Sequence, residues 1–124
     1  MKISCELDSF EENSVNNKFK LNIFTIVQEQ LNNIIKYAGA TEVIINLSQS
    51  IKSIVLTICD NGIGFDTVKK QKGIGITNIK SRVASYKGNV DFISKPGHEC
   101  ILAVIFPVTD ALLDKGRIIT APNK

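Results

Sequence analysis

The stretch Asp60-Asn61-Gly62-Ile63-Gly64-Phe65-Asp66 is the most informative part of this 124-residue chain. It follows an apolar run, Ile54 to Cys59, that predicts a buried strand. A carboxylate at a strand end, followed by two glycines, offers one fixed hydrogen-bond acceptor beside backbone that a flat ligand can approach closely. A second glycine pair, Gly73-Ile74-Gly75, follows shortly afterwards.

Simpler interpretations exist for these signals. Asn61-Gly62 is also typical of a tight hairpin turn, in which both central residues have positive φ. The glycine pairs do not complete the dinucleotide-binding fingerprint, because its sixth position is Thr67 in one case and Asn78 in the other. Neither pair is followed by Gly-Lys-Ser/Thr, which excludes a P-loop.

Composition indicates one globular domain, with 44% hydrophobic and 22% charged residues. The net charge of +3 is mild, and the 15 basic residues are scattered along the chain. The chain has only eight aromatic residues, six Phe and two Tyr, and few of them lie near basic runs, so we expect no nucleic-acid partner. The closest approach to a basic cluster is residues 69–72, Lys-Lys-Gln-Lys. It is either a solvated loop or a group of positively charged side chains near bound phosphates.

The cysteines and apolar runs indicate a cytoplasmic location. Cys5, Cys59 and Cys100 are odd in number and lack metal-ligand spacing, which favours reduced thiols. The longest apolar run, residues 101–106, is too short to span a bilayer. The first residues lead into acidic rather than apolar sequence, so we expect neither a signal peptide nor direct membrane insertion.

Hydrophobic periodicity predicts seven elements. Alternation at Ile3, Cys5 and Leu7 predicts an edge strand, and helical spacing predicts a helix over residues 17–38 that ends at Gly39. The further elements are strands at 41–48 and 53–59, a helix from about residue 74 that Gly88 stops, and a hairpin of strands 89–94 and 100–107. This order predicts an α+β two-layer sandwich, a mixed β-sheet covered on one face by helices. We expect the domain at residues 1–107 and a C-terminal tail at 108–124.

A polar stripe marks the first predicted helix. Glu29, Asn33 and Lys36 share one face by i, i+4 and i, i+3 spacing, with Tyr37 at its margin. The apolar positions Val27, Leu31, Ile34 and Ala38 are expected roughly opposite, so the stripe need not be buried in the core. It is either a solvated face or a ligand site, since amide and carboxylate oxygens suit a largely hydrated Mg²⁺ that also touches phosphates.

Three segments together resemble a known family. Residues 27–38 are similar to the N box of sensor histidine kinases, residues 60–65 to their G1 box and residues 72–79 to their G2 box. Residues 88–100 resemble the closing hairpin. Because order, spacing and chemistry agree, the chain resembles the Bergerat-fold (GHKL) ATP-binding domain, and most closely its nitrate-sensor (NarX-like) branch.

The resemblance implies roles for the matching residues. Asp60 would accept a hydrogen bond from the exocyclic amine of adenine, while Lys36 would stabilise phosphate charge. Asn33 would ligate Mg²⁺, with Glu29 as a second candidate ligand, and the catalytic candidates are Glu29, Asn33 and Lys36. The residues expected to bind ATP are Asn33, Lys36, Tyr37, Asp60, Gly62, Gly64, Phe65, Gly73, Ile74, Gly75, Ile76 and Cys100. Cys100 stands where the family often has threonine, and Glu99 where it often has glycine.

The implied function is that of the Mg·ATP-binding catalytic domain of a two-component sensor histidine kinase. It would donate the ATP γ-phosphate to a histidine on a dimerisation domain absent from this chain, with a response regulator as an indirect partner. The parent kinase could be membrane-anchored. His98 follows Pro96-Gly97 in an expected turn, so we interpret it as a loop residue rather than the acceptor. The alternatives are a free-standing serine kinase of the anti-sigma-factor type and a non-catalytic module that only binds partners.

Overall fold

The computed structural model describes residues 1–62, 76–93 and 99–114, with the backbone alone at position 37. Five strands form one sheet in the order β1-β2-β3-β5-β4. Their bounds are β1 Lys2–Asp8, β2 Glu42–Gln49, β3 Ser53–Asp60, β4 Asn89–Ile93 and β5 Cys100–Pro107. β1 runs parallel to β2, and the other neighbouring strands are antiparallel, so the sheet is mixed as predicted.

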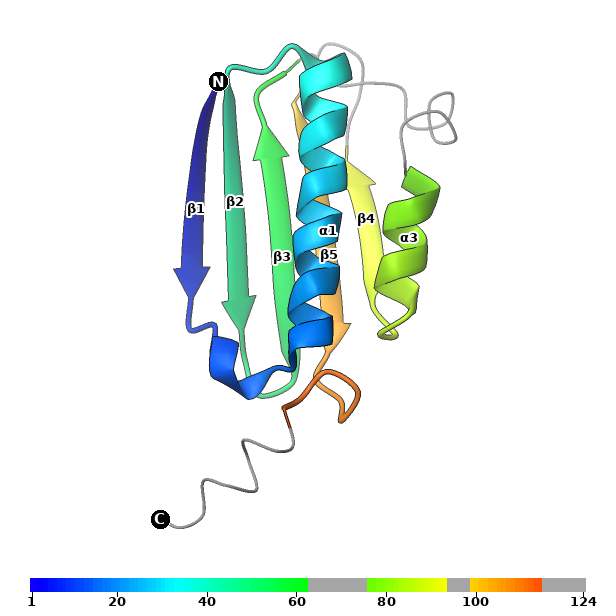
Figure 1. Ribbon diagram of the computed structural model, residues 1–124. Coiled ribbons are helices and arrows are strands. Elements are labelled where there is room, and N and C mark those ends of the chain that lie inside the picture. Colours follow the sequence, from blue (N-terminus) through cyan, green and yellow to red (C-terminus); the bar gives the residue numbers. More distant parts are fainter. Residues whose placement is uncertain (63–75, 94–98, 115–124) are drawn as a thin grey trace.

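The described helices lie on one side of the sheet. The helix α1 (Asn17–Asn33) continues into the π-helical turn η2 (Ile34–Ala38), α3 spans Ile76–Ala84 and the 3₁₀ turn η1 spans Glu12–Ser14. Figure 1 shows α1 in front of β3 and β5 and α3 beside β4, whereas β1 and β2 have no helix in front of them. The predicted α+β two-layer architecture is confirmed. None of the helices in the described ranges is both long and apolar enough to cross a bilayer.

The core lies between the sheet and α1. Alternate residues of β3 and β5 are buried, because successive side chains of a strand point to opposite faces. Phe19 of α1 packs edge-to-face on Phe106 of β5 and on Tyr86 after α3, with ring centroids 5.0 Å apart in both pairs. Each such pair contributes about 0.5–1.5 kcal/mol beyond its buried area. This aromatic cluster joins α1, β5 and the end of α3.

The ends of the first helical segment follow from its sequence. The side chain of Asn16 accepts a hydrogen bond from the Phe19 N–H at 2.8 Å, which caps the start of α1. Gly39 ends η2 in the left-handed conformation at φ 61°, as predicted. The single α-helix expected over residues 17–38 is wrong in its last turn, because Ile34–Ala38 is a π-helix. Apolar spacing does not reveal a change from i→i+4 to i→i+5 hydrogen bonding.

Residues 108–114, which we assigned to the tail, pack on the rest of the domain. Leu112 is fully buried in the hydrophobic core, and its carbonyl accepts a hydrogen bond from the Asn16 N–H at 2.8 Å. The Asp114 N–H donates to the Ser14 carbonyl at 2.9 Å, and Leu113 forms a bridge with Val15. The packed unit therefore extends past Pro107 to at least Asp114.

Candidate functional site

Asp60 is the last residue of β3, and its carboxyl is buried on the helix side of the sheet. Its side chain is 1% exposed. Oδ1 accepts a hydrogen bond from the Gly62 N–H at 2.9 Å, whereas Oδ2 has no hydrogen-bond partner among the described residues. Within the described part of the chain, Oδ2 is the one buried side-chain nitrogen or oxygen that makes no hydrogen bond. An unsatisfied buried acceptor costs about 1–3 kcal/mol, so this oxygen points to a donor supplied by a ligand.

Gly62 lies so close to the end of η2 that no side chain fits there. A Cβ at this position would be 2.5 Å from the Ala38 carbonyl oxygen, 2.7 Å from the Ala38 Cβ and 2.9 Å from Asp60 Oδ1. The contact brings the end of the first helical segment against the residues after β3. Asn33 and Asp60 thus belong to neighbouring elements at the same end of the sheet (Figure 1).

The side chain of Asn61 links the end of β3 to the start of β2 by hydrogen bonds. Its Oδ1 accepts hydrogen bonds from the N–H groups of Thr41 at 2.9 Å and Glu42 at 3.0 Å, and its Nδ2 donates to Thr41 Oγ1 at 3.0 Å. Neither Asn61 nor Gly62 has a positive φ, which a type I′ hairpin turn requires at both positions. The hairpin interpretation of Asn61-Gly62 is therefore wrong.

Asn33 at the end of α1 is buried, whereas the apolar spacing alone did not require the polar stripe to be buried. It is 8% exposed, and its Nδ2 donates to Oε1 of Gln30, which is 1% exposed, at 3.3 Å. This hydrogen bond satisfies one donor of Asn33 and the acceptor of Gln30 inside the domain. None of the described residues donates to Asn33 Oδ1, so that oxygen is available to a ligand.

The other candidates on this segment differ in exposure. Glu29 is half-buried and Lys36 is exposed. Ile34 and Ala38 are buried, as the predicted apolar face requires, but Val27 and Leu31 are only half-buried at its flank. Sequence patterning missed Gln30, because an amide among apolar positions gives no periodic signal until its partner is known.

The remaining predicted residues are partly described. Cys100 is buried and pairs with Asp60 across β3 and β5, and Ile76 is buried at the first residue of α3. The predictions for Gly64, Phe65, Gly73, Ile74 and Gly75 lie outside the described residues, as do the side chain of Tyr37, the basic segment 69–72 and His98.

Burial raises the pKa of Asp60 above its ordinary value of 3.8. The hydrogen bond from the Gly62 N–H lowers this pKa, and the negative charge of Glu99 raises it further. Glu99 was not among the predicted site residues. Its place immediately before Cys100, the strand partner of Asp60, is the sequence signal that could have found it.

The raised pKa of Asp60 predicts how stability depends on pH. Between the unfolded value near 3.8 and the higher folded value, the folded state binds more protons than the unfolded state, so the free energy of unfolding falls as pH rises through this window. We expect the nucleotide-free wild type to gain stability relative to Asp60→Asn as the pH is lowered from neutrality towards that lower limit. Urea denaturation of both proteins at each pH measures this difference. A difference that is constant with pH would contradict a buried carboxylate at Asp60.

The chain is similar in sequence to histidine kinases. The family model "Histidine kinase-, DNA gyrase B-, and HSP90-like ATPase" matches residues 20–110. The signal transduction histidine-protein kinase/phosphatase DegS of Brevibacillus brevis is 33% identical over 88 residues, which cover 70% of this chain and 23% of DegS. The sensor histidine kinase ComP of Bacillus subtilis is 36% identical over 81 residues, which cover 63% of this chain and 10% of ComP. The chain therefore spans less than a quarter of the length of these two curated relatives.

Solved structures with a similar fold are also histidine kinases. The Acinetobacter baumannii histidine kinase AdeS matches with a TM-score of 0.68 at 19% identity, over 87% of this chain and 55% of that chain. The histidine kinase domain of the blue-light activated kinase from Erythrobacter litoralis matches with a TM-score of 0.66 at 18% identity, over 86% of this chain and 54% of that chain. At these identities the likeness supports the fold alone, and the family model carries the assignment. The chain belongs to the histidine kinase-, DNA gyrase B- and HSP90-like ATPase family, as an ATPase domain of the histidine-kinase type.

Proposed function

We propose that this domain binds Mg·ATP and donates the γ-phosphoryl group to a histidine on a separate dimerisation domain. The phosphohistidine would then supply a response regulator, and the reaction would take place in the cytoplasm. The γ-phosphoryl group leaves ADP and forms a P–N bond with the imidazole of the acceptor. The domain contributes chiefly by orienting ATP and stabilising its charge.

The observation that supports this proposal is the buried Oδ2 of Asp60, which none of the residues in the described ranges hydrogen-bonds. Because Oδ1 is already held by the Gly62 N–H, the carboxyl presents one lone acceptor in a fixed direction. The exocyclic amine of adenine is a donor of the matching kind. Gly62, which has no side chain, lies beside Oδ1 of the same carboxyl, and a glycine at this position allows a flat base to approach closely.

The oxygen donors at the end of α1 fit a magnesium ion brought in with the phosphates. Asn33 offers Oδ1, since its Nδ2 is occupied by Gln30, and Glu29 lies one helical turn earlier in a half-buried position. Hard oxygen ligands of this type suit Mg²⁺, which would neutralise charge on the phosphates. Exposed Lys36 adds a positive charge within the same segment.

Histidine is favoured over serine as the acceptor because the relatives reported above are named as histidine kinases. A free-standing serine kinase would use the same nucleotide residues, so the two candidates differ only in the phosphorylated partner. The chemistry of the product separates them, because a phosphohistidine is labile in acid and a phosphoserine is not.

The test supplies the domain with γ-labelled ATP, Mg²⁺ and the histidine-bearing domain of a related kinase such as DegS. We expect acid-labile label on that domain, and little ADP formation when it is left out. The matched control replaces the acceptor histidine with glutamine. Label that is acid-stable, or that persists on the histidine-free domain, would contradict histidine transfer.

A further inference from the structure

The strand β1 lies at one edge of the sheet, and none of the described residues pairs with its outer side. The Lys2 N–H donates to the Thr41 carbonyl at 2.9 Å, so the backbone of Lys2 faces β2. Successive residues of a strand face opposite ways, and the backbone groups of Ile3, Cys5 and Leu7 therefore face away from β2. Strand edges of this kind are usually protected by proline, a bulge or charged side chains. β1 has no proline and no bulge, since all seven residues pair with residues 42–48 in unbroken register, and its charges alternate with Ile3, Cys5 and Leu7 along the strand.

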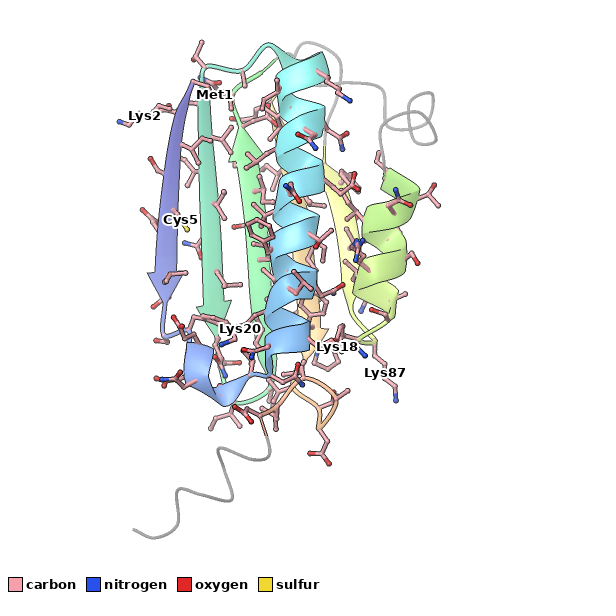
Figure 2. All side chains as sticks on the ribbon, in the orientation of Figure 1. Met1, Lys2, Cys5, Lys18, Lys20 and Lys87 are labelled. Carbon is pink, nitrogen blue, oxygen red and sulfur yellow. The ribbon has the colours of Figure 1, made fainter. Side chains whose placement is uncertain are left out.

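The helix-facing side of this edge is apolar and exposed. Ile3 is 49% and Leu7 is 63% exposed, because α1 does not extend over β1. Between β1 and α1 lies a groove of about 270 Å³, whose walls include Leu7, Phe10 and Phe24. Phe24 is itself 60% exposed. Figure 2 shows Cys5 midway along β1 and Lys2 at its start, pointing away from the sheet.

The sequence of β1, Lys-Ile-Ser-Cys-Glu-Leu-Asp, is complementary to itself when reversed. In an antiparallel pair, opposite residues must both face the partner strand or both face away. Full overlap of two copies of β1 meets this condition and places Cys5 opposite Cys5. Ile3 then lies opposite Leu7, and Lys2 lies opposite Asp8 twice across the two-fold axis. Cross-strand apolar and opposite-charge pairs are both stabilising.

Other allowed registers of this pairing are worse. If the two-fold axis moves by one residue towards the C-terminus of β1, Glu6 lies opposite Glu6, and like charges directly opposite are destabilising. A shift towards the N-terminus keeps Lys2 opposite Glu6 twice, but it leaves both Leu7 and Asp8 without a partner residue within the strand and so loses the Ile3–Leu7 pairs. The edge strand β4, Asn-Val-Asp-Phe-Ile, places Asp91 opposite Asp91 at full overlap. Self-complementarity thus distinguishes β1 from the opposite edge.

We propose that β1 pairs with β1 of a second copy of this chain, antiparallel and in full overlap about Cys5. The two sheets then form one continuous sheet, and the exposed Ile3 and Leu7 side chains of both copies cover each other beside the two grooves. The contact is isologous and closes as a dimer. It uses residues outside the candidate nucleotide site and does not depend on the function proposed above.

Charge reversal tests the pairing in the full chain by sedimentation equilibrium. We expect the wild-type mass to rise from 13.6 kDa towards twice that value with concentration. Lys2→Glu and Asp8→Lys should each weaken dimerisation about tenfold, because two attractive pairs become repulsive. Lys2→Glu also places a second negative charge beside Glu42 within the monomer, whereas Asp8 lies beside the uncharged Ser48. Asp8→Lys therefore changes the charge at the proposed contact without adding a like-charge pair between β1 and β2. The double variant Lys2→Glu/Asp8→Lys should restore dimerisation.

Oxidative crosslinking tests the register. A hydrogen-bonded antiparallel pair has Cα atoms about 5.5 Å apart, within the range that a disulfide spans. Cys5 is exposed, while Cys59 is half-buried and Cys100 is buried. With copper(II)–phenanthroline as oxidant, two Cys5 thiols lose two protons and two electrons and form one disulfide. We expect a crosslinked dimer that Cys5→Ser abolishes and Cys59→Ser does not.

Two controls make the outcome decisive. Asp91→Lys reverses a charge on the opposite edge and should leave dimerisation unchanged, and far-ultraviolet circular dichroism should show that each variant is folded. A chain that stays monomeric at all concentrations would overturn the proposal. A dimer that Asp91→Lys alters and the β1 variants do not, or a double variant that fails to recover, would also overturn it.

Discussion

Gly62→Ala is expected to abolish nucleotide binding and to lower the free energy of unfolding by about 1–3 kcal/mol, the usual cost of overpacking a close contact. The added Cβ would lie 2.5 Å from the Ala38 carbonyl oxygen, which is backbone and cannot rotate away. Relief requires η2 and the residues after β3 to separate, and this movement also displaces the Asp60 carboxyl that Gly62 holds. Denaturant unfolding and the ATP-dependent rise in melting temperature measure the two effects.

Two other glycines serve as controls. Gly39→Ala introduces a side chain into open space at φ 61°, so it carries only the backbone cost of about 1–2 kcal/mol and should bind ATP. Gly88→Ala would place a Cβ 2.8 Å from the Ile105 carbonyl oxygen, far along β5 from Cys100. It should destabilise the fold while keeping the ATP-dependent shift of the protein that remains folded. If Gly62→Ala binds ATP as Gly88→Ala does, the packing of Gly62 on Ala38 is irrelevant to the site.

The fold was largely predictable because each strand and helix carries its own periodic signal. The apolar alternation of Ile54, Leu56 and Ile58 predicted β3 and its buried face, and Gly39 predicted the end of the first helical segment. The π turn was not predictable, since the residues 34–38 are equally compatible with an α-helix. The packing of Leu112 was also missed, because the short apolar run of residues 111–113 gives too little pattern to assign a partner.

For the candidate site, the sequence proposes residues but does not give their arrangement. Asp60 and Asn33 were singled out from their residue types and from the resemblance to a family. The sequence could not give the burial of Asn33, because this depends on its hydrogen bond to Gln30. Nor could it give the role of Asn61, whose three hydrogen bonds reach back to Thr41 and Glu42. Such contacts arise from the tertiary fold, and turn propensity alone favoured the wrong conformation.

Asp60→Asn is expected to weaken ATP binding roughly 100-fold while leaving the nucleotide-free protein as stable as the wild type or more stable. The asparagine can keep the acceptor for the Gly62 N–H, but its NH₂ group then replaces Oδ2 and faces the adenine amine donor to donor. A site built around a substrate hydrogen bond loses much of its affinity when the partner no longer matches. The change also removes a buried carboxylate whose pKa is raised by desolvation, which is why stability should not fall.

Isothermal titration calorimetry with ATP gives the affinity, and urea denaturation without nucleotide gives the stability. Asp91→Asn is the matched control, because it makes the same chemical change at an exposed position of β4 and should alter neither quantity. Binding by Asp60→Asn within about threefold of the wild type would exclude Asp60 as the adenine acceptor. Loss of stability together with binding would instead indicate a structural role for the carboxyl.

The same variant separates recognition of the base from recognition of the phosphates. Guanine carries a carbonyl oxygen where adenine carries its exocyclic amine, so we expect the acceptor Oδ2 of Asp60 to favour ATP and disfavour GTP in the wild type. In Asp60→Asn the new NH₂ group can donate to that carbonyl, and the preference for ATP over GTP should therefore shrink or reverse. Contacts to the phosphates, for which Asn33 and Lys36 are the candidates, are common to both nucleotides and cannot produce this change. A preference for ATP that survives the substitution would place adenine recognition elsewhere in the domain.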